Sequence, residues 1–211
     1  MKKSIVQGGL FSNDPAALLY NERYTKFGRD IRTVGWSNDR DQALRFDVLF
    51  RGLDPRGMTI LDVGCGLGDL VPYLERRTSG DFNYIGIDVA AKLVEDARAV
   101  HAGSNCEFSA GDIFSIELPQ VDISVLSGAL SLKRDGVAAY ARDTLRQMIK
   151  LSRVAASLNF LTSYVDFEAP HNQHYQPEEV FSWAKEFSKR VNLIHDYPLY
   201  EFTIQTFTEN I

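Results

Sequence analysis

Gly64, Gly66 and Gly68 stand at every second position directly after an apolar run. A glycine loop between a buried strand and a helix lets backbone amides approach a ligand closely, as in many nucleotide sites. Two acids flank the loop, Asp62 before it and Asp69 after it. The pattern predicts a small-ligand site, although the glycines alone leave the ligand open.

The position of Asp69 separates two kinds of ligand. A dinucleotide fingerprint counted from Gly64 requires a third glycine at position 69, where this chain has the acid. A carboxylate there faces a pyrophosphate unfavourably, which disfavours a dehydrogenase. An acidic glycine loop instead suits a cationic ligand without phosphate, and S-adenosylmethionine, with a sulfonium, an ammonium and a ribose diol, fits.

Further acids follow the next two expected strands. Asp88 ends the second strand, where its carboxylate can accept both ribose hydroxyls. Asp112 follows the third strand and can accept from the adenine amino group, with Ile113 against the ring. The carboxyl ends of parallel strands share one edge of a sheet, so we expect these residues to lie together. The alternatives are a helix N-cap for Asp88 and a turn or cap role for Asp112.

Residues 58 to about 130 resemble the cofactor half of the class I S-adenosylmethionine-dependent methyltransferases. Residues 60–68 match the first motif, residues 84–88 the second-strand acid, and residues 111–113 the third motif. The resemblance implies S-adenosylmethionine as cofactor and S-adenosylhomocysteine as product. The expected cofactor residues are Asp62, Gly64, Cys65 (through its backbone), Gly66, Asp88, Val89, Asp112, Ile113 and Ser127.

Strand and helix patterns alternate from residue 58 onward. Expected strands cover 58–63, 82–87, 106–109, 121–126, 155–164, 191–196 and 200–207, with helices at 69–77, 90–101, 137–151 and 177–190. This order predicts an α/β three-layer sandwich with a Rossmann-like, seven-stranded, mostly parallel sheet whose last strand is antiparallel. Residues 1–53 are expected to form an N-terminal helical cap, and residues 54–211 the cofactor-binding domain.

The acceptor side is less well defined. His171 and His174 follow the fifth strand and are candidate bases, since an unperturbed imidazole has a pKa of about 6.5; exposed loop positions are the alternative. Tyr164 begins the same loop. Tyr24 or Trp36 of the cap can cover a sulfonium by cation–π contact, with core packing as the alternative.

Arg45 is the cap cation expected to meet the methionine carboxylate or an acidic substrate, with a solvated helix face as the alternative. Leu126, Ser127 and Gly128 stand where amino-methylating enzymes of DNA bases carry a proline- and aromatic-containing motif. That difference and the net charge of −5 argue against a DNA substrate.

We therefore expect a methyltransferase acting on an oxygen or nitrogen of a small molecule. A protein or RNA methyltransferase and a non-catalytic cofactor-binding regulator remain alternatives. Two cysteines without ligand spacing indicate neither disulfides nor a metal, and no apolar run reaches the roughly 18 residues of a membrane span. A cytoplasmic monomer or homodimer is expected.

Overall fold

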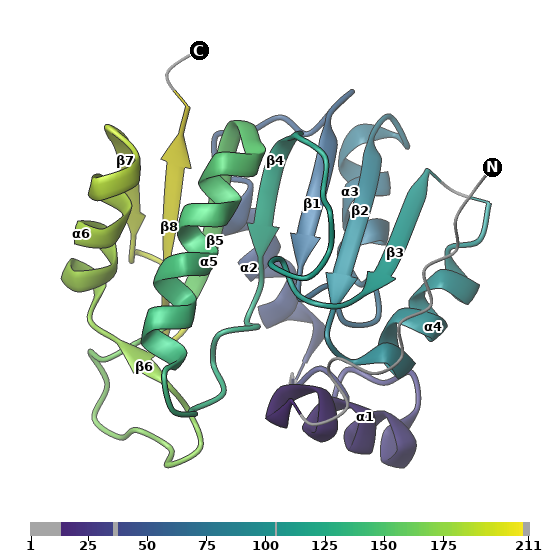
Figure 1. Cartoon of the computed structure of the whole chain (residues 1–211), viewed down its shortest axis with the longest axis horizontal. Coiled ribbons are helices and arrows are strands. Elements are labelled where there is room, and N and C mark those ends of the chain that lie inside the picture. The colour runs from purple at the N-terminus through teal and green to yellow at the C-terminus, as the bar shows by residue number, and fades with distance from the viewer. Residues whose placement is uncertain (1–13, 36–37, 104, 209–211) are drawn as a thin grey trace.

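A single sheet with helices on both faces forms the centre of the molecule (Figure 1). The structure is a computed structural model, and it describes residues 14–35, 38–103 and 105–208. The strand order is β3-β2-β1-β4-β5-β8-β7. The strands are β1 (Thr59–Val63), β2 (Asn83–Asp88), β3 (Cys106–Ala110), β4 (Val121–Leu126), β5 (Ser152–Thr162), β6 (His174–Tyr175), β7 (Arg190–Ile194) and β8 (Glu201–Phe207).

The strand directions confirm the predicted mostly parallel sheet with an antiparallel last strand. Strands β1 to β5 pair in parallel, and β8 runs antiparallel to both β5 and β7. Strand β8 lies inside the sheet, so β7 forms the edge. The sequence prediction missed β6, a two-residue strand that pairs with Leu161 and Thr162 at the end of β5.

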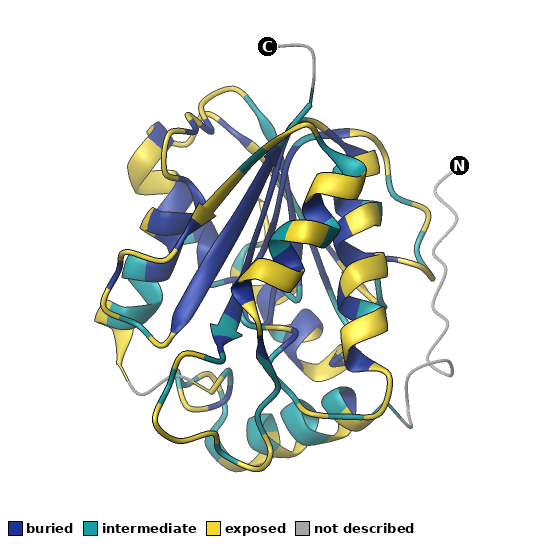
Figure 2. Cartoon of the chain, turned by 90° about the vertical axis from the view of Figure 1, so that its left-hand side faces the viewer, coloured by how far each residue is buried: buried dark blue, intermediate teal, exposed yellow. Residues whose placement is uncertain are grey.

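Two hydrophobic layers hold the helices against the sheet. One cluster joins α2 (Asp39–Leu49), α3 (Leu70–Thr78) and α4 (Ala91–Val100) to one face, and the other joins α5 (Val137–Leu151) and α6 (Pro177–Phe187) to the opposite face. Figure 2 shows the strands largely buried and the outer faces of the helices exposed. The side chains of successive strand residues alternate between the two clusters, as Ile60 and Leu61 do, which confirms the three-layer arrangement.

The helix starts follow from local sequence. Helix α6 begins with Pro177, whose missing N–H is no loss at a first helical position, and two acids follow in its first turn. Helix α1 (Pro15–Phe27) begins after Asp14, whose side chain accepts from the N–H groups of Ala16 at 2.8 Å and Ala17 at 3.3 Å.

Helix α1 lies across the carboxyl ends of the central strands and beside α4 (Figure 1). The Tyr24 hydroxyl donates to Asp96 of α4 at 3.0 Å, and the Asn21 side chain accepts from the Lys92 N–H at 3.2 Å. Helix α2, by contrast, contributes Phe46 to the same hydrophobic cluster as β1 and α3. Of the amino-terminal segment, α1 therefore lies over the strand ends, while α2 also packs into the core beside the sheet. The boundary between residues 53 and 54 stays a prediction.

Candidate functional site

A cavity of about 720 Å³ opens at the carboxyl edge of the sheet. Its floor is the glycine loop after β1 and the end of β2, its sides include Asp112 after β3 and the turn after β4, and residues of α1 and α2 cover it. This is the edge at which open parallel sheets bind ligands, because the strand order reverses between the parallel neighbours β1 and β4, and the chain leaves them toward opposite sides of a crevice.

The glycine loop packs closely against its surroundings. Gly64 has φ +78°, and a Cβ atom added there would lie 2.4 Å from the Cβ of Ala129 in the turn after β4. The N–H groups of Gly64 and Cys65 donate to the Ile87 carbonyl at 2.8 and 3.0 Å. Both the backbone conformation and the lack of space require glycine here. The loop is thereby fixed between β2 and the turn after β4.

Asp88 makes two hydrogen bonds with the backbone. Its Oδ1 accepts from the Ala90 N–H at 2.8 Å in the turn before α4, while its Oδ2 accepts from the Gly66 N–H at 2.9 Å. Ala90 itself is the N-cap residue of α4, so the side chain of Asp88 does not cap the helix, and its contact with ribose stays a prediction. The side chain also lines the cavity. Burial, the main cause, raises the pKa of this carboxyl, and the two backbone donors oppose the shift.

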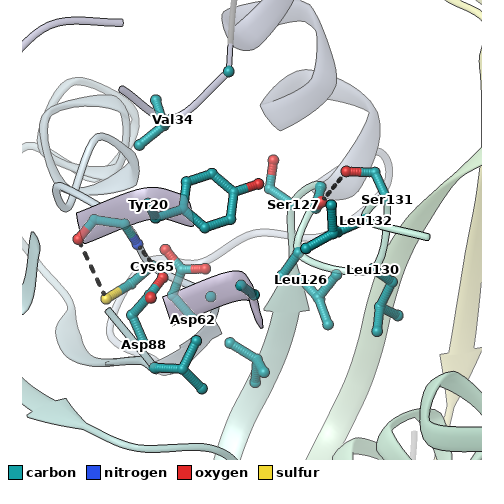
Figure 3. A pocket seen from close by; sticks show the side chains of 18 of the residues that line it. Tyr20, Val34, Asp62, Cys65, Asp88, Leu126, Ser127, Leu130, Ser131 and Leu132 are labelled. Atoms are coloured by element: carbon teal, nitrogen blue, oxygen red, sulfur yellow. Dashed lines mark hydrogen bonds between the residues drawn. The ribbon is translucent and has the colours of Figure 1, made fainter. Parts of the chain in front are cut away.

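Asp62 lies beneath the glycine loop (Figure 3). The Tyr84 hydroxyl donates to its Oδ2 at 2.7 Å. Burial raises the pKa of Asp62 to about 7; the Tyr84 hydrogen bond opposes this, and the charges of Asp88 and Asp69 add to it. Burial likewise raises the pKa of the Cys65 thiol, so this cysteine contributes no thiolate.

The remaining expected cofactor residues divide into two groups. Val89, Asp112 and Ser127 line the cavity. The Oδ1 of Asp112 accepts from the N–H groups at 114 and 115 at 3.0 and 2.9 Å, so the residue also shapes its turn. Ile113 is 1% exposed and packs in the core cluster shared with α5, and its side chain does not line the cavity. Its proposed contact with adenine stays untested.

A buried polar network, which the sequence did not reveal, supports the turn after β4. The Gly128 N–H donates to Asn159 Oδ1 at 2.8 Å, and Asn159 Nδ2 donates to Glu201 Oε2 at 2.7 Å. Arg45 donates through Nε to the same oxygen at 2.7 Å and through Nη2 to Oε1. Its Nη1 lies 3.4 Å from the Ser127 Oγ. Arg45 thus lines the cavity as the partner of a buried carboxylate rather than on a solvated helix face.

One face of α1 lines the cavity. Ala16, Leu19, Tyr20 and Arg23 follow the i, i+3, i+4, i+7 spacing of a single helix face, and all four line it. Tyr24 falls on the neighbouring face, against α4, and does not line the cavity. Of the two tyrosines, the structure therefore brings Tyr20 and not Tyr24 to the site. Residues 36 and 37, including the predicted Trp36, lie outside the described residues.

The two histidines after β5 have different surroundings. His171 is exposed and lines the cavity, and its carbonyl accepts from the Lys133 N–H at 2.9 Å. His174 begins β6, and its Nδ1 lies 2.7 Å from the Thr162 carbonyl. Neither His174 nor Tyr164 lines the cavity; Tyr164 is 61% exposed and donates to Glu178. Of the predicted bases, only His171 is placed to meet a ligand there.

The fold and the cavity define an α/β protein with a covered ligand-sized cavity at the carboxyl ends of β1 and β2. The sequence profile of the family described as "Methyltransferase domain" matches residues 54–196. The chain therefore belongs to this family, among the class I S-adenosylmethionine-dependent methyltransferases.

Individual relatives agree with this family assignment. A protein of Mycobacterium tuberculosis named as a methyltransferase is 36% identical over 154 residues, covering 69% of this chain and 90% of the relative. The malonyl-[acyl-carrier protein] O-methyltransferase of Acetivibrio thermocellus is 32% identical over 63% of this chain and 50% of its own. The magnesium protoporphyrin IX methyltransferase of Synechocystis, solved with bound S-adenosylhomocysteine, shares the fold with a TM-score of 0.64 at 15% identity, covering 88% of this chain and 93% of its own.

Two further findings concern the part of the chain that the structure describes. None of its helices has the length and apolar character needed to cross a membrane. Within the same ranges, no three His, Cys, Asp or Glu side chains come together as a metal site would require.

Proposed function

We propose that this protein transfers the methyl group of S-adenosylmethionine to an oxygen or nitrogen of a small-molecule acceptor. The observation that carries the proposal is the covered cavity of about 720 Å³, which joins the glycine loop and Asp88 to the turn after β4. Small-molecule sites usually occupy roughly 300–1,000 Å³. A cavity of this size, covered by α1, favours a small acceptor over a wide polymer surface.

The cavity residues fit the chemistry of this cofactor. When bound, S-adenosylmethionine supplies an electrophilic methyl group on a positively charged sulfur. Asp88 and Asp112 both line the cavity, and we assign the ribose hydroxyls to the first carboxylate and the adenine amino group to the second. The ionised form of Asp62, beneath the loop, attracts the ammonium group of the amino-acid end. The glycine loop and the turn after β4 fix these groups relative to one another, as in-line transfer requires.

At the acceptor end, His171 is the residue that can remove a proton. It lines the cavity with Asn172 and Leu161, near the end of β5. A base matters most for a hydroxyl acceptor, whose oxygen is a weak nucleophile until its proton leaves. We expect His171→Ala to lower turnover for hydroxyl acceptors and to spare amine acceptors that react with a free lone pair.

The deciding experiment has two stages. Calorimetry first measures the binding of S-adenosylmethionine and of NAD; binding of NAD alone would contradict the cofactor assignment. A panel of small hydroxyl, carboxyl and amine compounds is then tested for release of S-adenosylhomocysteine. Cofactor binding without turnover on any acceptor, small or macromolecular, supports the regulatory alternative.

A second candidate is an acceptor carried on a protein. Tyr164, Phe167 and Tyr200 are 61%, 76% and 77% exposed, and Tyr200 lines the cavity. The Thr162 N–H donates to the Tyr200 carbonyl at 3.1 Å, so the loop after β5 adjoins Tyr200. Exposed aromatic side chains of this kind are enriched at protein interfaces. Since one relative is named for malonyl-[acyl-carrier protein], the panel should include acceptors attached to a carrier protein; turnover of these alone favours this candidate.

A further inference from the structure

Helix α1 carries two tyrosines one turn apart whose surroundings differ. The Tyr24 hydroxyl is bound to Asp96 of α4, outside the cavity. Tyr20 lines the cavity and packs against a small hydrophobic cluster that includes Leu67 and Leu93. Asn21 and Thr25 also bond Lys92 of α4, so the position of Tyr20 over the cavity is fixed by the helix as a whole and does not depend on Tyr24 alone.

The Tyr20 ring extends across the cavity from α1. In Figure 3 it lies between the Cys65 and Asp88 side of the site and Ser127 in the turn after β4, with its hydroxyl directed toward Ser127. The side chain is close enough to Asp88 and Arg45 to experience both charges. Burial, the largest effect, raises the pKa of Tyr20, so the ring stays a neutral phenol at physiological pH.

The covalent structure of the cofactor places its sulfur between the same two parts of the site, Asp88 and the turn after β4. The sulfur is bonded to the ribose 5′ carbon and to the methyl group that is transferred. With the ribose on Asp88 and the methyl group directed to the turn after β4, the sulfur must lie between them. We propose that the Tyr20 ring covers this sulfur and makes the cavity favour the sulfonium of S-adenosylmethionine over the neutral sulfur of S-adenosylhomocysteine. The inference rests on the proposed function.

The physical basis is the attraction of a cation to the face of an aromatic ring, which strengthens when water is excluded. The guanidinium of Arg23 also lies near this ring, 5.5 Å from its centroid. A second cation on the same ring weakens the attraction for the first. The expected preference is therefore modest, and removing the Arg23 charge should increase it.

The test compares the two ligands on the full chain. Calorimetry gives the ratio of the dissociation constant of S-adenosylhomocysteine to that of S-adenosylmethionine. Relative to the unsubstituted chain, Tyr20→Leu and Tyr20→Met should lower this ratio about fivefold, since both lack a ring. Tyr20→Phe keeps the ring face and should leave the ratio within about twofold. Arg23→Met should raise it, even if Arg23 also contacts a group that both ligands share.

Tyr24→Leu is the matched control, because it removes a tyrosine of the same helix that does not line the cavity; it should leave the ratio unchanged. An unchanged ratio in a folded Tyr20→Leu or Tyr20→Met chain overturns the inference, as does a fall in Tyr20→Phe as large as in Tyr20→Leu. If both ring-less variants fail to fold by circular dichroism, Arg23→Met decides, and a ratio that does not rise overturns it. Failure of the unsubstituted chain to bind either ligand contradicts the proposed function instead.

Discussion

At the scale of single residues, Asp62 links the cavity to pH. Burial raises the pKa of its carboxyl to about 7, far above the usual value, and the ammonium group of the cofactor favours the ionised form. We therefore expect the affinity for S-adenosylhomocysteine, which keeps the ammonium group, to rise about tenfold between pH 6 and pH 8, as the ionised fraction rises. Calorimetry across this range is the measurement, and Asp62→Asn should flatten the profile.

The same residue has the opposite effect on folding. A carboxyl whose pKa is higher in the folded than in the unfolded chain stabilises the fold at low pH, where it is protonated in both states. Its contribution is lost as pH rises from about 4, the usual value, to about 7. Asp62→Asn should remove this loss from the free energy of unfolding. A native chain whose cofactor affinity is independent of pH would contradict the first expectation, and an equal pH dependence of the free energy of unfolding in the native and Asp62→Asn chains would contradict the second.

Gly64 differs from glycines of other turns, such as Gly80, because its surroundings leave no room for a side chain. Gly64→Ala forces a Cβ atom to within 2.4 Å of Ala129 at φ +78°. We expect at least a tenfold loss of S-adenosylhomocysteine affinity, about 1.4 kcal/mol, because the loop must move away from the turn after β4. Gly80→Ala is the control, since Gly80 has φ +82° but nothing within 4 Å. It should cost about 1–2 kcal/mol of stability and leave the affinity unchanged.

Sequence alone could identify the acids and glycines of the loop because each has a fixed place relative to a strand end. It could not assign Ile113, because an apolar residue after a strand has the same pattern whether it faces a ligand or the core. Asn159 and Glu201 were also missed. A single polar residue inside an apolar strand indicates a buried partner but not which one, and here the partners come from α2 and the turn after β4.

At the scale of elements, the Arg45–Glu201 pair joins α2 to the start of β8. Both side chains are buried, at 8% and 6% exposure. Arg45→Met leaves the Glu201 carboxylate without its charged partner, and we expect it to lower the free energy of unfolding by about 3–5 kcal/mol. Adding Glu201→Gln should recover part of the loss, because the amide carries no charge and can still contact Asn159.

Urea denaturation measures these differences, and an exposed ion pair beside the same helix supplies the control. Arg51 pairs with Asp196 at 2.7 Å, with side-chain exposures of 45% and 70%. Because water screens this pair, Arg51→Met should cost less than about 1 kcal/mol. Equal losses for Arg45→Met and Arg51→Met would show that burial does not set the strength of the Arg45–Glu201 pair.

Helix α1 shows why an element can be predicted while its orientation is not. The sequence predicted a helical cap, and Asp14 and the glycine after Phe27 bound this helix of it. The apolar run at residues 16–20, however, gives the helix no single apolar face, and Leu18 is 54% exposed. Only the contacts with α4 decide that Tyr20 faces the cavity and Tyr24 does not.

At the scale of the whole molecule, a mostly parallel sheet with helices on both faces follows from the alternation of strands and helices, which is visible in the sequence. The sequence does not show which residues close the cavity. Its residues run from Asp14 to Glu201, and the Arg45–Glu201 pair alone joins positions 156 residues apart. No local pattern specifies contacts across such distances, because they form only when the sheet has assembled.

A site built from both ends of the chain exists only in the folded state, so its ligand should stabilise the whole molecule. S-adenosylhomocysteine at 100 times its dissociation constant should add about 2.7 kcal/mol to the free energy of unfolding. For a chain of this length that corresponds to a rise in Tm of roughly 5–10 °C, measurable by calorimetry or dye fluorescence. Asp88→Ala should abolish most of this rise at the same ligand concentration, because the ribose loses its acceptor, while the fold loses only the hydrogen bonds to the Ala90 and Gly66 N–H groups. Asp81→Ala, an exposed acid away from the cavity, should keep the full rise. An equal rise in Asp88→Ala would place the ribose elsewhere in the cavity, and a rise with NAD but not with S-adenosylhomocysteine would contradict the cofactor itself.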